Sequence, residues 1–351
     1  RQMCIRDRFY SMADTIIVGK FVGTKALAAV GSTGTIMFLI NGFILGMTAG
    51  FTVLTAQKFG AGDMKAMRKT VGNAAILAII MSLIMTVLGM MAMKPLLGIM
   101  KTPDDIFKDA YAYIMVICGG IAAQMLYNFL SSVLRALGNS KVPLYFLILA
   151  ALLNIVLDMV FIIAFHMGAA GAAWATVISQ GISGILCLLY IAKKVPALYL
   201  HREDWEIDKN LAGWQLKIGL PMAFQYSITA IGTIVVQSCL NILGSTAAAG
   251  FAAASKIEQV FTQAYVALGT TMATYCAQNM GAGKYTRIRK GFKSATLIGF
   301  IYAVVTGVII FFVGKYMTIF FVSENVNQIM EYVDIYLRCV SVSFLPLVIV
   351  N

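Results

Sequence analysis

Two carboxylates, an amide and a hydroxyl lie within stretches of this sequence that are otherwise apolar. Asp14 lies in the first stretch, Asn154 and Asp158 lie four residues apart in a later one, and Thr176 lies in the next. Ionisable side chains inside membrane-spanning helices cost free energy and usually face an ion pathway. Oxygen atoms of these kinds suit a proton or a hard cation. We therefore predict that the four residues form a cation site, with Na⁺ as the metal if a metal binds.

The depth of these residues in the membrane supports one shared site. At about 1.5 Å per residue, Asp14 lies roughly 9 Å inside the helix end at Lys20, and Asp158 lies roughly 12 Å inside the end at His166. Thr176 lies roughly 10 Å inside its own helix, measured from the same side. The alternative is that each side chain makes a separate hydrogen bond between neighbouring helices.

A second polar pair, Lys256 and Glu258, lies about one third of the way into a later apolar stretch. Residues two positions apart point to different sides of a helix, so each side chain needs its own partner. We expect the pair to contribute to a substrate cavity or a second polar site. A structural ion pair is the alternative.

The composition indicates an all-α polytopic membrane protein. Apolar residues make up 60% of the chain and charged residues 12%, and the apolar stretches can form the helices of about 20 residues that cross a bilayer. The net charge of +12 could indicate a nucleic-acid partner. However, the basic residues sit in short loops, as the positive-inside rule predicts. We expect contact with membrane lipid, no nucleic acid, and no cofactor beyond H⁺ or Na⁺ as a coupling ion.

A repeat with an offset of 221 residues divides the chain into two homologous halves. Residues 56–62 read AQKFGAG and residues 277–283 read AQNMGAG, and an Arg-Lys pair follows at the same distance in both copies. In a membrane protein such repeats are typical of a central pathway between two related lobes. Each Gly-Ala-Gly lacks the Gly-Lys-Ser/Thr of a phosphate loop, so it predicts a tight turn.

The repeat also predicts the domain organisation. We expect an N-terminal lobe at 9–192, a cytoplasmic linker at 193–213, which we expect to be solvated, and an incomplete C-terminal lobe at 214–351. Shifting the fifth and sixth segments by 221 predicts two further helices, so we expect the intact protein to have twelve and this chain to be truncated at both ends. Residues 1–8 are expected to be foreign to the fold or a truncation boundary. Ten apolar segments are expected, at about 9–22, 28–57, 70–93, 110–136, 142–165, 169–192, 214–243, 248–279, 294–313 and 330–351.

The distribution of lysine and arginine predicts the orientation in the membrane. The loops that contain both repeat motifs and the linker hold sixteen basic residues, whereas the alternate loops hold six. Positive charge marks cytoplasmic loops. We therefore expect a multi-pass protein of the cell (plasma, or inner) membrane, with its N-terminus and repeat-motif loops in the cytoplasm.

Five motifs together resemble the multidrug and toxic compound extrusion (MATE) transporters. The likeness extends from Phe9 to Asn351 and is nearest to the prokaryotic branch that includes the DinF-like proteins. The motifs are Asp14–Gly19 (DTIIVG), residues 56–57 (AQ) with 60–62 (GAG), Arg135–Asn139 (RALGN), Asn154–Asp158 (NIVLD) and Gly171–Thr176 (GAAWAT).

The resemblance implies a two-lobed antiporter of twelve helices that exports small amphipathic, often cationic, organic compounds in exchange for H⁺ or Na⁺. In that branch an aspartate of the first helix, the Asn-x-x-x-Asp pair of the fifth and a threonine of the sixth form the cation site. These positions fall on Asp14, Asn154, Asp158 and Thr176, the same four residues that the depth comparison selects. We expect a monomer.

Two other functions are alternatives to the antiporter. A flippase for lipid-linked oligosaccharides belongs to the same superfamily, and it would favour a larger and more cationic cavity than Lys256 alone suggests. An intramembrane enzyme belongs to a different class and requires a nucleophile–base or metal constellation. The two isolated histidines and the scattered cysteines do not supply one, so we expect no enzyme.

Overall fold

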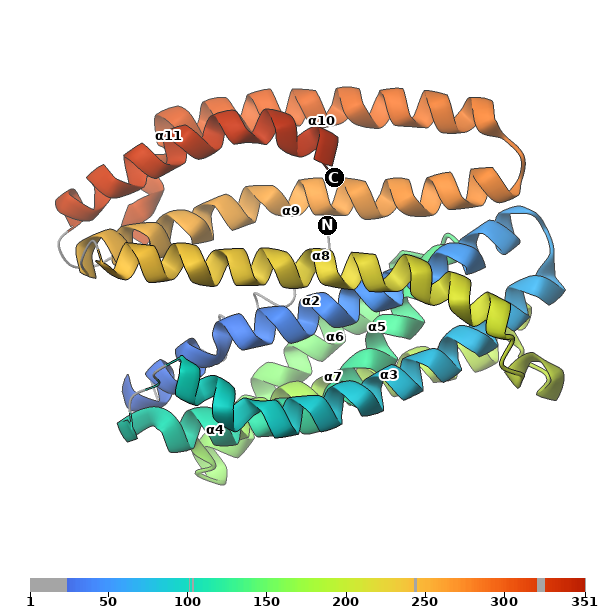
Figure 1. The fold of residues 1–351 in the computed structure, drawn as a ribbon, viewed down its shortest axis with the longest axis horizontal. Coiled ribbons are helices and arrows are strands. Elements are labelled where there is room, and N and C mark those ends of the chain that lie inside the picture. The colour runs from blue at the N-terminus through green and yellow to red at the C-terminus, as the bar shows by residue number, and fades with distance from the viewer. Residues whose placement is uncertain (1–23, 101, 103, 243–244, 321–325, 351) are drawn as a thin grey trace. The chain divides into compact units, whose positions relative to one another are not determined.

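The computed structural model describes residues 24–100, 102, 104–242, 245–320 and 326–350. The expected segment at 9–22 therefore lies outside the described residues. Within them, every regular element is helical (Figure 1). In chain order the elements are α2 (Thr24–Gly60), α3 (Met64–Ile99), α4 (Asp104–Gly119), α5 (Ile121–Ala136), α6 (Lys141–Asp158), η1 (Met159–Ala164), α7 (Gly168–Lys194), η2 (Pro196–Leu198), η3 (Arg202–Trp205), α8 (Lys209–Ile242), α9 (Ser245–Gly281), α10 (Tyr285–Val313), η4 (Gly314–Phe320) and α11 (Val326–Val350).

The chain forms two compact units that divide within α8, between Ala230 and Ile231. The first unit therefore contains the start of α8 as well as α2 to α7, and the second contains the rest of α8 with α9 to α11. Each unit is described separately below. The lobe boundaries expected from the repeat, at 192 and 213, stay a prediction.

Several helices have the length and surface of membrane spans. Among the described residues six helices are long and apolar enough to cross a membrane, and a seventh is added if α4 and α5 count as one span. Those two helices are bent by 47° at Gly120, where a Cβ would lie 2.6 Å from a methyl carbon of Val177. On α3 the side chains of Leu83 and Val87 are more than half exposed, as lipid-facing residues are. The prediction of an all-α polytopic membrane protein is confirmed.

The two halves repeat at the level of single residues. Helix α2 ends at Gly60 and α9 ends at Gly281, and α3 begins at Met64 while α10 begins at Tyr285. Both differences, 281 − 60 and 285 − 64, equal 221. The last glycine of each motif has a positive φ, 75° at Gly62 and 68° at Gly283, a conformation that favours glycine because it has no Cβ. The tight turn predicted from each Gly-Ala-Gly is confirmed.

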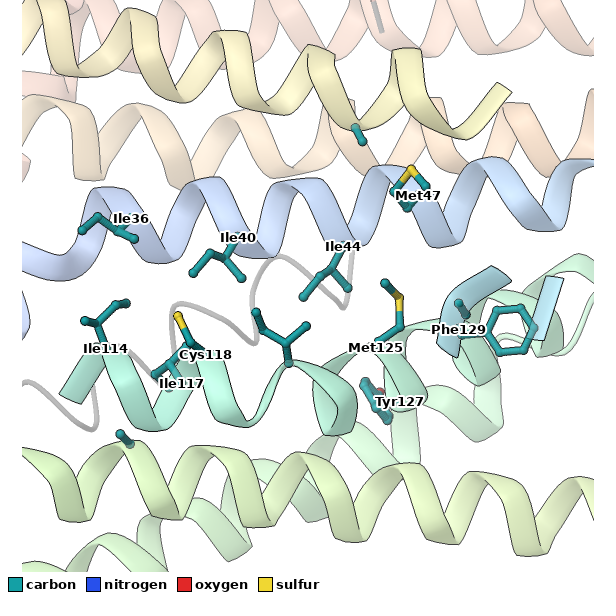
Figure 2. Close-up of a cluster of buried hydrophobic side chains, with 14 of the residues drawn as sticks. Ile36, Ile40, Ile44, Met47, Ile114, Ile117, Cys118, Met125, Tyr127 and Phe129 are labelled. Carbon is teal, nitrogen blue, oxygen red and sulfur yellow. The ribbon is translucent and has the colours of Figure 1, made fainter. Parts of the chain in front are cut away.

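The core of the first unit is built from helix faces with matching spacing. On α2, Ile36, Ile40 and Ile44 recur every four residues and are buried. Figure 2 shows them facing Ile114, Ile117 and Cys118 of α4 and Met125 of α5. Repetition every three or four residues places side chains on one helix face. Because this face is buried, it fixes α2 against the helices that precede the Asn154–Asp158 segment.

A ladder of glycines brings α2 and the start of α8 into backbone contact. Gly42, Gly46 and Gly50 follow one another at four-residue intervals on α2. A Cβ at Gly46 would lie 2.6 Å from the Ala223 Cα, and one at Gly50 would lie 2.7 Å from the Gly219 nitrogen. Small residues at this spacing allow helices to pack closely in membranes. The first part of α8 is therefore held by the first unit.

The linker after α7 contacts α3 over part of its length, while most of its side chains between residues 193 and 213 are exposed. The Asp204 side chain is buried, and the cost of burying it is offset because its Oδ2 accepts a hydrogen bond from the His201 backbone N–H at 2.9 Å and lies 3.5 Å from Nε of Arg68. The Asn73 side chain donates to the Asp208 carbonyl at 3.1 Å. A Cβ at Gly72 would overlap the Asp204 carbonyl oxygen, so glycine leaves the space that the linker occupies.

Candidate cation site

Three of the four predicted site residues lie together in the first unit. Asn154 and Asp158 are both fully buried on α6, and Thr176 on α7 is 4% exposed. The Asn154 Nδ2 donates to the Thr176 Oγ1 at 3.4 Å, which joins the two helices at the level of the site. Asp158 lies one helical turn from Asn154 on the same face. Asp14 lies outside the described residues.

The sequence of α6 explains why its polar residues face inward. Its buried residues are spaced four, three, four and four positions apart, so they form a single stripe along the helix. Bulky residues such as Leu149 and Leu152 point outward instead, with exposed side chains. The stripe consists of Pro143, Leu147, Ala150, Asn154 and Asp158. A carboxylate and an amide therefore occupy positions that would otherwise hold core residues.

Small residues on α7 allow it to approach this stripe. Ala169, Ala172 and Ala173 precede Thr176 and are buried. A Cβ at Gly171 would lie 3.2 Å from the Phe161 Cβ, which leaves little space for a larger residue there. Close packing brings a short threonine side chain within hydrogen-bonding distance of the amide.

The helix changes its type immediately after Asp158. Residues Met159–Ala164 form the π-helix η1, and the chain then turns through His166 with φ of 51° and Gly168 with φ of 60°. π-helical turns are rare and are frequently found at functional sites. The π-helix begins directly after Asp158, the carboxylate predicted from the sequence to bind the cation.

The chemistry of this cluster suits a small cation. A buried carboxylate is costly unless a proton, a cation or hydrogen-bond donors neutralise it. The Asn154 Oδ1 is buried and accepts no hydrogen bond from the described part of the chain. A carboxylate and an amide oxygen one turn apart on α6, with the Thr176 hydroxyl of α7 next to the amide, supply the all-oxygen ligands that Na⁺ prefers, and the carboxylate alone can take up H⁺.

The second polar pair lies in the other unit. Glu258 on α9 is half-buried, and its Oε2 accepts a hydrogen bond from the Tyr336 Oη on α11 at 2.7 Å. The Tyr336 ring packs edge-on against Phe251, with ring centroids 5.2 Å apart. Lys256 lies on the same helix, but its side chain is outside what the structure describes. Glu258 therefore has its own partner, as the i,i+2 spacing predicts.

Sequence reasoning missed a further group of buried amides. Gln124 and Asn128 on α5 and Gln180 on α7 are all buried. Their signal in the sequence is an amide residue inside an apolar segment, the same signal that selected Asn154. Without a charged neighbour in the sequence, these amides could not be told apart from ordinary packing residues.

Comparison with known proteins agrees with this architecture. The MatE family matches residues 5–160 and 221–351. The chain is 33% identical over 318 residues to the "Probable multidrug resistance protein YpnP" of Bacillus subtilis, which covers 90% of this chain and 70% of that protein. It is 24% identical to the "FAD transporter" of Shewanella oneidensis, covering 97% of this chain and 76% of that protein.

A solved structure has the same fold. An outward-facing multidrug resistance MATE family transporter of the MOP superfamily superposes with a TM-score of 0.88 at 21% identity, covering 98% of this chain and 77% of the other. Together with the family match and the apolar helices, this likeness shows a multi-pass membrane transporter and not an enzyme. The chain belongs to the MatE family of MATE transporters.

Proposed function

We propose that the chain is a secondary antiporter of the cell membrane that exports amphipathic, cationic organic compounds in exchange for H⁺ or Na⁺. The DinF-like branch is the proposed branch of the family. The observation that carries the proposal is the buried contact between Asn154 and Thr176, one helical turn from the buried carboxyl group of Asp158. This cluster has the composition of a cation site, and we assign Asp14 to it as the fourth member.

Coupling would follow from the way the cation changes helix packing. Binding of H⁺ or Na⁺ neutralises the Asp158 carboxylate, which favours a conformation in which α6 and α7 pack tightly around it. A ligand shifts such an equilibrium only by its difference in affinity for the two states. Because binding energies are reciprocal, a cation that favours one conformation also changes the affinity for the exported compound.

The second unit supports a cationic substrate. Glu258 offers a carboxylate at half-buried depth, and the neighbouring Phe251 and Tyr336 supply aromatic rings. An acid next to aromatic faces binds organic cations well. Lys256 is assigned to the same second polar site. The alternative, a flippase, would require a site that favours the anionic phosphates of a lipid-linked oligosaccharide, and the acidic Glu258 argues against one.

The orientation is also part of the proposal, and it rests on the sixteen basic residues of one set of loops. We place the turns at Gly62 and Gly283 in the cytoplasm. A cysteine introduced at Asp63 in a cysteine-free protein should resist an impermeant reagent added outside intact cells. Labelling from outside would contradict the orientation.

Gradient-driven export by Asp158→Asn tests the function. The substitution keeps the shape of the side chain but removes its charge, so export from vesicles of the full-length protein should fall to background under imposed H⁺ and Na⁺ gradients. The matched control is Asp334→Asn, which removes a carboxylate that pairs with Arg338 at 2.8 Å within α11. Export by well-folded Asp158→Asn at the wild-type rate would refute the proposed site.

A further inference from the structure

A row of buried amides continues from the candidate cation site along the first unit. Gln180 follows Thr176 by four residues on α7, so it lies about 6 Å further along the same face. Gln180 is 4% exposed and Gln124 is fully buried. The Oε1 atoms of both glutamines, and also the Nε2 of Gln124, have no hydrogen-bond partner among the described residues.

Helix contacts place the two glutamines at one level. A Cβ at Gly181 would lie 3.6 Å from the Ala123 Cβ, and one at Gly184 would lie 3.3 Å from the Tyr127 nitrogen. Residue numbers rise together along both helices, so α5 and α7 run parallel. Gln124 follows Ala123 and Gln180 precedes Gly181, so the two residues lie within about 3 Å of each other in height along the helix pair.

Helical geometry also places them on one side of that pair. Successive residues are rotated by about 100° around an α-helix. On α5, Gln124 points about 60–70° away from the side that contacts α7. On α7, Gln180 points away from the side that contacts α5 by a similar angle, in the opposite sense. In parallel helices, opposite rotations project to the same side. Helix α6 flanks that side, because the Ser183 Oγ donates to the Phe146 carbonyl at 3.2 Å.

The row extends along α5 to its last turn. Asn128 lies one turn after Gln124, and its Nδ2 donates to the Gln124 carbonyl at 2.8 Å, while its Oδ1 has no partner within the described ranges. Ser131 and then Arg135 continue the same face. The Arg135 guanidinium donates to the Ser132 Oγ at 2.7 Å. The row therefore connects the level of Gln180 with the helix end at Arg135.

Amide oxygens buried without protein partners require another partner. An unsatisfied buried polar group costs free energy, and water or an ion usually satisfies it. We propose that Gln180, Gln124 and Asn128 line a hydrated path along which the coupling cation moves between the Asn154–Asp158–Thr176 site and the helix end at Arg135. The amide oxygens replace part of the hydration shell of Na⁺, or they hold the waters that relay H⁺.

This inference rests on the proposed function, and replacement of the amides by leucine tests it. Gln124→Leu and Gln180→Leu in the full-length protein should each slow gradient-driven export by about tenfold, the effect of losing one buried hydrogen bond, and the double variant should slow it by up to about a hundredfold. Substrate binding without a gradient should be unchanged. Gln180→Asn, which keeps an amide, should restore most of the rate.

Gln215→Leu is the matched control. Gln215 is also a fully buried glutamine, and its Oε1 likewise has no partner among the described residues. It lies on α8, outside the row, where its Nε2 donates to the Thr70 carbonyl of α3 at 2.9 Å. This variant should lower the melting temperature without slowing export. If export slows in the Gln124 and Gln180 variants and in Gln215→Leu alike, in proportion to the stability that each loses, the amides serve packing and the proposed path is wrong.

A second measurement keeps the proposal testable if the leucine variants do not fold. A cysteine at Gln180 in a cysteine-free protein should react with a small, water-soluble thiol reagent, because the path carries water. No reaction would overturn the proposal. If Asp158→Asn abolishes export while the double leucine variant exports normally, only the path fails and the proposed function stands.

Discussion

The docking of the linker on α3 can be tested by adding one methyl group. In Gly72→Ala the new Cβ would overlap the carbonyl oxygen of Asp204 and lie 2.9 Å from its carbonyl carbon. Carbon atoms in ordinary contact lie about 3.5 Å or more apart, so the linker backbone must move by at least roughly 0.6 Å. Both partners are backbone atoms, so no side-chain rotation relieves the overlap.

The cost follows from the two ways in which the protein can respond. If the linker stays docked, overpacking destabilises the protein by about 1–3 kcal/mol. If it undocks, the hydrogen bond from Asn73 to Asp208 is lost, at about 1 kcal/mol, together with the partly exposed Arg68–Asp204 pair, at about 0–1 kcal/mol. The two costs are similar, so the docked and undocked states should become comparably populated.

Limited proteolysis measures that population. We expect trypsin to cleave after Arg202 and Lys209 faster when the linker backbone is undocked, and each loss of about 1.4 kcal/mol should raise the cleavage rate about tenfold. The control is Gly98→Ala on the same helix, where a Cβ meets nothing within 4 Å. If Gly72→Ala is cleaved no faster than Gly98→Ala and melts at the same temperature, the docked linker is wrong.

Three further substitutions have expected outcomes. Gly46→Ala should destabilise the protein by about 1–3 kcal/mol, because its Cβ would meet the α8 backbone at 2.5 Å; unfolding in detergent should show no such loss for Gly34→Ala, which meets nothing within 4 Å. Lys284→Asp should stabilise α10 by about 0.5–1 kcal/mol. At the equivalent N-cap of α3, Asp63 accepts a hydrogen bond from the Ala66 N–H, whereas the Lys284 side chain makes no capping hydrogen bond. An unchanged melting temperature would contradict this. Tyr336→Phe should cost about 1–3 kcal/mol by removing the donor to Glu258 and should alter the range of exported compounds, whereas equal stability and an equal range would show that the contact is incidental.

The sequence was informative wherever a feature repeats along the chain. The 221-residue offset predicted that α10 begins where α3 does, because the same turn residues require the same backbone. The i,i+4 spacing of Asn154 and Asp158 predicted their common buried face, since a helix allows no other arrangement. Both features depend on local geometry alone.

Features that depend on contacts between distant residues could not be predicted in this way. The charges of the polar linker are visible in the sequence, whereas the space at Gly72 that receives the Asp204 carbonyl is not. The amides of Gln124 and Gln180 lie 56 residues apart, and only the parallel packing of α5 and α7 brings them to one level. The fourth site residue, Asp14, stays a prediction.

The linker is held mostly through its backbone, so we expect substitutions within it to be tolerated better than insertions or deletions. Asn73 and the space at Gly72 recognise the carbonyl groups of Asp208 and Asp204, which every amino acid carries. Most linker side chains can therefore be replaced without losing these contacts. An inserted residue, however, would move one carbonyl by up to about 3.5 Å relative to the other, further than either contact tolerates. Tags and fusion partners should accordingly be placed outside residues 201–209, and the length of this segment should be preserved when chimaeric halves are exchanged.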